Sequence, residues 1–278
     1  MKLGVMLDSL PGDWDLEVKL KAVAECGYDG VEFGFGLTGP VSVESTEEEL
    51  DKVKELVKKY GLELYSLAGS MYWGTSLTSD SPEIREEGKR YLRRHIEVAA
   101  YLGCETILVV PGYVHVDFLP NCPIVDYDVV YNRALEWIEE IKPYAEEKNV
   151  EIGIENVWNK FLLSPVEMRD FIDKADSKYV GVYFDAGNVV LSGFPEHWIK
   201  VLGSRIKKVH FKDYRRAIGD LNGFVDLLSG DIDYVKVNAA LKEIGYDGWV
   251  TAELGFGVKS PGLWLKNTYN AMKEIVNS

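Results

Sequence analysis

Four side chains that can bind a metal ion stand at the ends of apolar, strand-like segments in the second half of the chain. The segments cover residues 151–157, 180–184, 207–211 and 249–254, and the side chains are Glu155, Asp185, His210 and Glu253. Burying several carboxylates close together is costly unless a cation compensates their charge. If these segments are neighbouring parallel strands, their ends meet, and the pattern predicts one metal centre.

The donor types narrow the choice of metal. Three carboxylates and one imidazole suit Mn²⁺, Mg²⁺ or Co²⁺, whereas a structural zinc site would need cysteines or more histidines. We expect one divalent ion, with Mn²⁺ as the first choice and Zn²⁺ as the last of the four.

Strand-like and amphipathic helix-like segments alternate along the whole chain. The earlier strand-like segments cover residues 3–7, 30–35, 62–67 and 106–110, and several helix-like segments end at glycine or asparagine, as at Gly27, Gly103 and Asn149. Eight such pairs in 278 residues predict a single α/β domain over residues 1–278, a (β/α)₈ barrel. An open doubly wound sheet is the competing fold, but no GxGxxG loop follows the first strand. Loops at 66–82 and 111–126 are long enough to cover the barrel mouth.

Composition limits the class of partner and the compartment. The net charge of −14 disfavours nucleic acid, because nucleic-acid binders carry a basic face. Cys26, Cys104 and Cys122 form no CxxC pair, which suits a reducing compartment. We expect no signal peptide at the N-terminus and no membrane span, because no segment has the length that a span needs. We therefore expect a cytoplasmic protein without a membrane partner.

The metal-binding residues also lie in recognisable motifs. Ile154-Glu155-Asn156, Phe184-Asp185-Ala186-Gly187-Asn188, Val209-His210-Phe211-Lys212-Asp213 and Thr251-Ala252-Glu253 together resemble the xylose-isomerase-like sugar (phosphate) isomerase/epimerase superfamily. The likeness is strongest to ketose 3-epimerases and to L-ribulose-5-phosphate 3-epimerase-like proteins. It implies that all four residues bind the metal, that Glu155 and Glu253 also act as the acid/base pair, and that Arg216 holds the sugar.

The resemblance implies proton transfer next to a sugar carbonyl. One glutamate would remove the C3 proton of a ketose to give a cis-enediolate, and the other would return a proton on the opposite face. Return of the proton to C1 would instead make the protein an aldose–ketose isomerase. The sugar is free or phosphorylated. Aromatic side chains of the early loops, Trp14, Tyr72, Trp73 and Tyr113, are candidates to exclude water, and Trp73 is expected to contact the sugar.

Three positions qualify the resemblance. Phe161 stands where ketose epimerases have a further glutamate, and Asn188 stands where they have a histidine. Asn188 is expected either to contact the sugar or to cap the following helix. Arg215, next to Arg216, leaves open which arginine faces the substrate.

Other functions fit less well. Apurinic-site endonucleases share this barrel, but their three-zinc cluster needs several more histidines than the four of this chain. A non-catalytic sugar-binding barrel would not need the acid/base pair. Pairing into a homo-oligomer is possible, since barrels of this family often pair.

Overall fold

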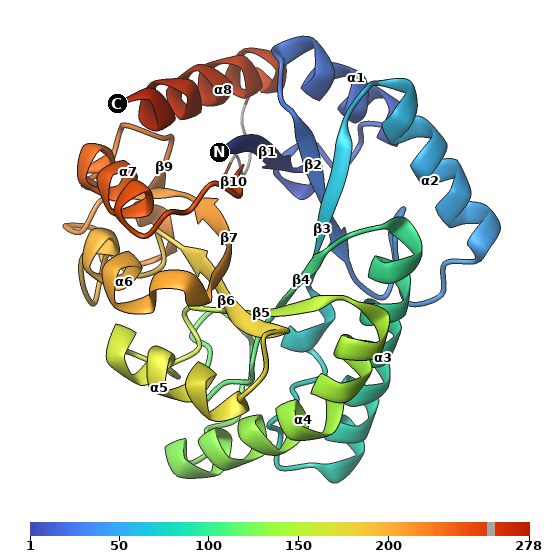
Figure 1. The fold of residues 1–278 in the computed structure, drawn as a ribbon, viewed down its shortest axis with the longest axis vertical. Coiled ribbons are helices and arrows are strands. Elements are labelled where there is room, and N and C mark those ends of the chain that lie inside the picture. The colour runs from blue at the N-terminus through green and yellow to red at the C-terminus, as the bar shows by residue number, and fades with distance from the viewer. Residues whose placement is uncertain (255–258) are drawn as a thin grey trace.

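The computed structural model describes residues 1–254 and 259–278. Among these residues, eight parallel strands close into a barrel in the order β1-β10-β7-β6-β5-β4-β3-β2, which confirms the predicted (β/α)₈ fold (Figure 1). They are β1 (Lys2–Met6), β2 (Gly30–Phe35), β3 (Glu63–Gly69), β4 (Thr106–Val109), β5 (Glu151–Glu155), β6 (Val180–Asp185), β7 (Ile206–Phe211) and β10 (Trp249–Ala252). The carboxyl ends of all eight therefore lie at one mouth.

In the described part of the chain, eight α-helices surround the strands (Figure 1). They are α1 (Leu16–Cys26), α2 (Glu47–Lys59), α3 (Pro82–Leu102), α4 (Tyr127–Lys148), α5 (Pro165–Ala175), α6 (Pro195–Leu202), α7 (Tyr234–Glu243) and α8 (Pro261–Asn277). Their boundaries have local causes. Thr46 and Glu49 form a capping box at the start of α2, and Gly27, Gly103 and Asn149 end α1, α3 and α4 in the left-handed conformation. The helix ends predicted at these three residues are confirmed.

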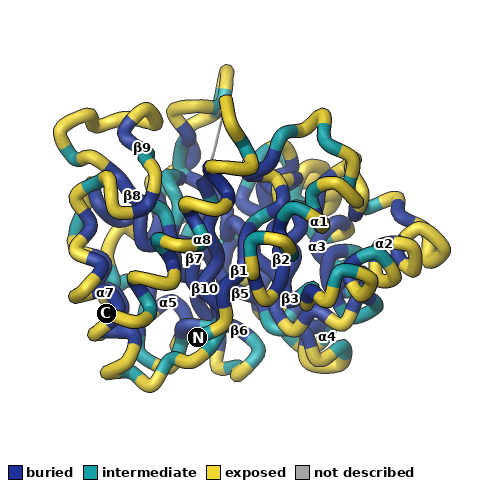
Figure 2. Tube along the Cα trace, turned by 90° about the horizontal axis from the view of Figure 1, so that it is seen from above, coloured by how far each residue is buried: buried dark blue, intermediate teal, exposed yellow. Residues whose placement is uncertain are grey.

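The strands and the inner helix faces form the main buried core, and Ala68, Leu108 and Tyr183 form a second, smaller cluster. The outward helix faces are exposed (Figure 2). None of the described helices is both long and apolar enough to cross a membrane. A short antiparallel hairpin, β8 (Asp213–Tyr214) with β9 (Phe224–Val225), follows β7 and was not predicted. It lies beyond the carboxyl end of β7 and places residues 213–225 beside the mouth.

His95, on α3, is a buried histidine outside the cluster of candidate ligands. Its ring stacks on Phe35 with the centroids 4.4 Å apart, and its Nδ1 is hydrogen bonded to the hydroxyl of Tyr72 at 3.0 Å. Burial lowers the pKa of His95 from 6.5 to about 3, because the charged imidazolium loses its hydration. His95 is therefore a neutral packing residue and not a ligand.

This burial predicts a loss of stability in acid. The pKa of His95 is lower in the folded than in the unfolded chain, so the unfolded chain binds the extra proton. The free energy of unfolding should hence fall as the pH drops from about 6.5 towards 3. The free energy of unfolding should be measured by urea titration across this pH range. Its slope against pH should be smaller in His95→Gln than in the wild type, by the amount that corresponds to one bound proton. His197→Gln, at an exposed position, should behave like the wild type; equal slopes for His95→Gln and wild type would contradict the assignment.

Candidate metal centre

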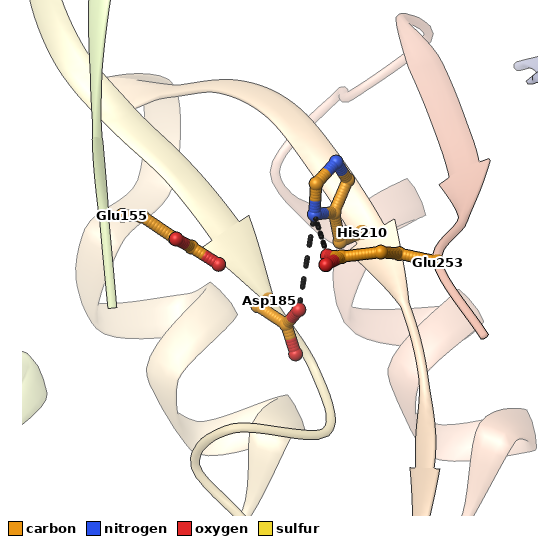
Figure 3. Close-up of side chains that lie close together, drawn as sticks. All are labelled: Glu155, Asp185, His210 and Glu253. Atoms are coloured by element: carbon orange, nitrogen blue, oxygen red, sulfur yellow. Dashed lines mark ion pairs between the residues drawn. The ribbon is translucent and has the colours of Figure 1, made fainter. Parts of the chain in front are cut away.

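The structure brings the four predicted ligands together at the barrel mouth. Glu155 and Asp185 are the last residues of β5 and β6, His210 is the last but one of β7, and Glu253 directly follows β10. One ligand atom from each lies within 4.8 Å of all the others. Figure 3 shows the three carboxylates and the imidazole facing a common space. The strand register causes this, since Asp185 pairs with His210 across β6 and β7.

Three buried atoms of the cluster are left without a well-formed hydrogen bond in the described part of the chain. They are Oδ2 of Asp185, Nδ1 of His210 and Oε2 of Glu253. Nδ1 of His210 lies 2.6 Å from Oε2 of Glu253 and 3.8 Å from Oδ2 of Asp185. Native proteins rarely leave buried polar atoms unsatisfied. Orphaned atoms that converge in this way, on oxygen and nitrogen donors, fit a divalent cation.

Two asparagines position the acidic residues, Asn156 through the backbone of Asp185 and Asn188 through the carboxylates of Asp185 and Glu155. The side chain of Asn156 accepts from the backbone N–H of Asp185 (2.9 Å) and donates to its carbonyl (2.8 Å). The backbone N–H of Asn188 donates to Oδ1 of Asp185 (2.8 Å), and its Nδ2 donates to Oε1 of Glu155 (3.3 Å). Oδ1 of Asp185 is thus engaged, and Oδ2 is the oxygen that faces the centre.

Lys212 is a member of the site that the sequence analysis did not identify. Its Nζ lies 3.0 Å from Oδ2 of Asp185 and 2.9 Å from Oε2 of Glu253, and its side chain is only 12% exposed. The sequence could have identified Lys212, because it stands two residues after the candidate ligand His210, just beyond the end of β7. Lys212 brings an ammonium group to the cavity directly beside the proposed ligands.

Glu32, on β2, is a second site residue that the sequence analysis missed. It is fully buried and reaches across the barrel to His210, whose Nε2 lies 2.9 Å from Oε1 of Glu32. Its other oxygen accepts from the hydroxyl of Tyr183, which also contacts Oγ of Ser66 at 3.1 Å. A carboxylate on Nε2 fixes the imidazole ring and its tautomer, leaving Nδ1 as the nitrogen that could bind a metal ion.

Removal of the Glu32 carboxylate should therefore weaken metal binding. Loss of such an outer partner typically lowers metal affinity by about 10- to 100-fold, and we expect this range for Glu32→Gln. Titration calorimetry with Mn²⁺ would measure it. Glu63→Gln, at an exposed glutamate at the start of β3, is the matched control. Affinities for Glu32→Gln within twofold of this control would contradict the orienting role.

The charges of the cluster are strongly coupled. Burial raises the pKa of Glu155 and of Asp185, against the opposing effect of Lys212. Burial acts in the same direction on Glu253, but Lys212 and His210 outweigh it and hold its pKa well below the usual range. Burial disfavours the imidazolium of His210, yet Glu32 and Glu253 outweigh burial and raise its pKa. A divalent cation would compensate the carboxylates that burial drives towards protonation.

A cavity of about 990 Å³ opens above the cluster. Glu155, His210, Lys212 and Glu253 line its polar side, and apolar side chains form much of the rest, including Met6, Ala68, Leu108 and Val110. Both predicted loops contribute, through Trp73 and Phe118, whose rings meet edge to face with centroids 5.2 Å apart. The cavity is concave, largely apolar and has a few convergent polar groups, as expected of a small-molecule site.

Of the three predicted substrate-binding residues, Trp73 and Asn188 line this cavity and Arg216 does not. The guanidinium of Arg216 donates to the carbonyl of Val190 (3.1 Å) and faces the ring of Phe194. Arg215 lines the cavity in its place. Of the two roles expected for Asn188, the structure supports a place in the cavity wall. It does not support a helix cap, because α6 begins after Phe194 without a side-chain cap.

The remaining predicted residues serve mainly in packing. Trp14, Tyr72 and Tyr113 are not among the residues that line the cavity, and Tyr72 instead contacts His95. Phe161 is buried against Tyr127 and Phe171. Phe161 is not among the residues that line the main cavity and brings no carboxylate to it.

These features define a (β/α)₈ barrel with a cluster at its mouth that could hold a divalent metal ion. The chain belongs to the xylose isomerase-like TIM barrel family, whose model matches residues 20–274. A protein of Methanocaldococcus jannaschii whose name assigns it no activity is 27% identical over 264 residues, covering 91% of this chain and 83% of that protein. Inosose dehydratase of Bacillus thuringiensis is 26% identical over 219 residues, covering 71% and 72%. The structure of D-psicose 3-epimerase in the presence of D-fructose superposes with a TM-score of 0.80 at 19% identity, covering all of both chains.

Proposed function

We propose that this protein is a metal-dependent epimerase that acts at C3 of a ketose, free or phosphorylated, with Mn²⁺ as its ion. One observation carries the proposal. Glu155 and Glu253 come from the two ends of the four-strand arc β5-β6-β7-β10, with Asp185 and His210 between them (Figure 3). A sugar above the centre would therefore have a carboxylate on either side, as proton removal from one face and return to the other require.

The residues of the chain would divide the reaction between them. A bound divalent cation supplies Lewis acidity, which makes the C–H bond next to a sugar carbonyl acidic enough for a carboxylate to break. One of the two glutamates takes the C3 proton, the C–H electron pair forms the cis-enediolate, and the other glutamate returns a proton to the opposite face. The Lys212 ammonium, which lines the cavity, can donate a hydrogen bond to an enediolate oxygen. The apolar wall excludes water from this intermediate.

Two further reactions share the first proton transfer. If the proton returns to C1, the enzyme is an aldose–ketose isomerase. If the hydroxyl on the carbon beyond the carbanion leaves instead, a C=C bond forms, water is released and the enzyme is a dehydratase. Two observations favour the dehydratase as the second candidate function. The chain has relatives named inosose dehydratase, and Lys212 lines the cavity, where it can donate a hydrogen bond to a departing hydroxyl.

The positions of the histidines do not support an endonuclease activity. The chain has four, and only His210 belongs to the metal centre. His95 is buried against Phe35, His115 lies 3.5 Å from Asp117 in the loop after β4, and His197 lies in α6. A three-zinc cluster would need several of them at one place.

Solvent exchange tests the proposal. The Mn²⁺-loaded protein should be incubated in deuterated water with ketopentoses, ketohexoses, their phosphates and an inosose, and followed by NMR. We expect deuterium at C3 of at least one ketose, together with its C3 epimer. An aldose product would favour the isomerase, and an alkene from inosose would favour the dehydratase. No exchange in any ketose would overturn the epimerase proposal.

A further inference from the structure

A second cavity adjoins the main one beside β5 and β6. Its volume is about 520 Å³, against about 990 Å³ for the main cavity. The two share the lining residues Phe118, Val157, Trp158, Asn188, Leu221 and Asn222. Pockets of about 300–1,000 Å³ hold drug-sized ligands, so each cavity alone has room for one sugar ring. Together they exceed what a single pentose or hexose can fill.

The second cavity begins close to the reacting centre. Asn188 lines both cavities, and its Nδ2 lies 3.3 Å from Oε1 of Glu155. One side chain therefore separates the second cavity from a proposed acid/base group. A substituent on the reacting sugar could enter it while the carbonyl and the neighbouring hydroxyl stay at the metal centre.

Trp158 forms a fixed wall shared by the two cavities. Its Nε1 donates to the carbonyl of Asn188 at 2.9 Å. The indole also packs against Tyr214 and Phe224, with centroid distances of 5.5 and 5.2 Å. The hydrogen bond satisfies the polar edge of the indole. Its apolar face is then available to pack against the C–H face of a sugar ring.

The lining of the second cavity favours a neutral, hydroxylated ligand over a phosphate. Lys160 is the cation among its lining residues, and it is paired with Asp117 at 2.6 Å. Asp220 and Asn222 also line it, and these side chains suit hydroxyl groups. A phosphate would need uncompensated Arg or Lys donors, whereas a glycosyl unit needs hydrogen-bonding groups and an apolar platform.

We propose that this second cavity binds a glycosyl unit attached to the reacting sugar, so that the preferred substrates are glycosylated ketoses. The proposal rests on the function proposed above and adds the substrate class. It predicts that the enzyme turns over a ketose with a glycosyl substituent more efficiently than the same ketose without one.

The test compares D-fructose with its 4-O- and 6-O-glucosyl derivatives as substrates for the Mn²⁺-loaded protein. We expect kcat/KM for C3 proton exchange to be at least tenfold higher for one of the glucosyl ketoses. Leu191→Trp places an indole in the second cavity from an exposed lining position. In this variant, the kcat/KM for the glucosyl ketose divided by the kcat/KM for fructose should be at least tenfold lower than in the wild type. Leu263→Trp, at an exposed position on α8, is the matched control and should keep the wild-type ratio.

The outcomes separate the two proposals. Exchange in fructose with no advantage for either glucosyl ketose would overturn the glycosyl site and leave the epimerase proposal standing. An advantage that survives Leu191→Trp, in a variant that melts at the wild-type temperature, would also overturn the second cavity as its cause. Exchange in none of the three sugars would overturn the glycosyl site, whereas the epimerase proposal is overturned only if no ketose of the wider panel exchanges.

Discussion

Replacing Glu253 by glutamine should lower the rate of C3 proton exchange by about 10³-fold, within the range of general acid–base catalysis. Glutamine has nearly the same shape, but it can neither accept the C3 proton nor return one. Glu155→Gln should have an effect of similar size, because in each variant one face of the sugar loses its carboxylate. Solvent deuterium incorporation measured by NMR would quantify both effects.

The control for this prediction must separate acid–base chemistry from metal loss, since both glutamates are also candidate ligands. Exchange should be measured at saturating Mn²⁺, with the bound metal determined for each variant. Glu274→Gln removes an exposed carboxylate of α8 and should exchange at the wild-type rate. A metal-loaded Glu155→Gln or Glu253→Gln variant with wild-type exchange would disprove the two-carboxylate assignment.

Removal of the metal should abolish turnover and lower stability together. A ligand that binds only the folded state at 100 times its Kd contributes about 2.7 kcal/mol to the free energy of unfolding. We expect a stabilisation of this order when Mn²⁺ is added to chelator-treated protein, measured by urea denaturation. Turnover should return in the same titration.

Asp185→Asn tests whether this stabilisation comes from the proposed centre. The backbone N–H of Asn188 can still donate to Oδ1, but the amide nitrogen that replaces Oδ2 cannot bind a cation. The variant should fold and show little stabilisation by Mn²⁺. Asp13→Asn, at an exposed aspartate, should be stabilised as the wild type is. Full stabilisation of Asp185→Asn, or turnover that survives exhaustive chelation, would rule out the metal mechanism.

The ligand cluster could be predicted from sequence because each member stands at the end of a strand. Parallel strands in one barrel must end at the same mouth, so the strand pattern alone brings Glu155, Asp185, His210 and Glu253 near one another. The predicted strand ends were less accurate. β5 ends at Glu155 and not at residue 157, because the side chain of Asn156 takes up hydrogen bonds with the β6 backbone.

The role of Glu32 and the choice of the arginine that lines the cavity could not be predicted from sequence, for different reasons. Glu32 lies inside β2, and its partner His210 is far away in the chain, so no local pattern links them. The choice between Arg215 and Arg216 depends on the hairpin of β8 and β9. These strands have two residues each, which is too short to produce the alternation from which a facing side is predicted.

The bond between Glu32 and His210 also bears on how the barrel assembles. It joins β2 in the N-terminal half of the chain to β7 in the C-terminal half, whereas all four candidate ligands lie in the C-terminal half. A folding intermediate that had formed only strands β5 to β10 would hold every ligand but would lack the carboxylate that orients the imidazole. Metal affinity would then rise by about 10- to 100-fold when the barrel closes and Glu32 reaches His210, so the bound ion would favour the closed barrel over such an intermediate.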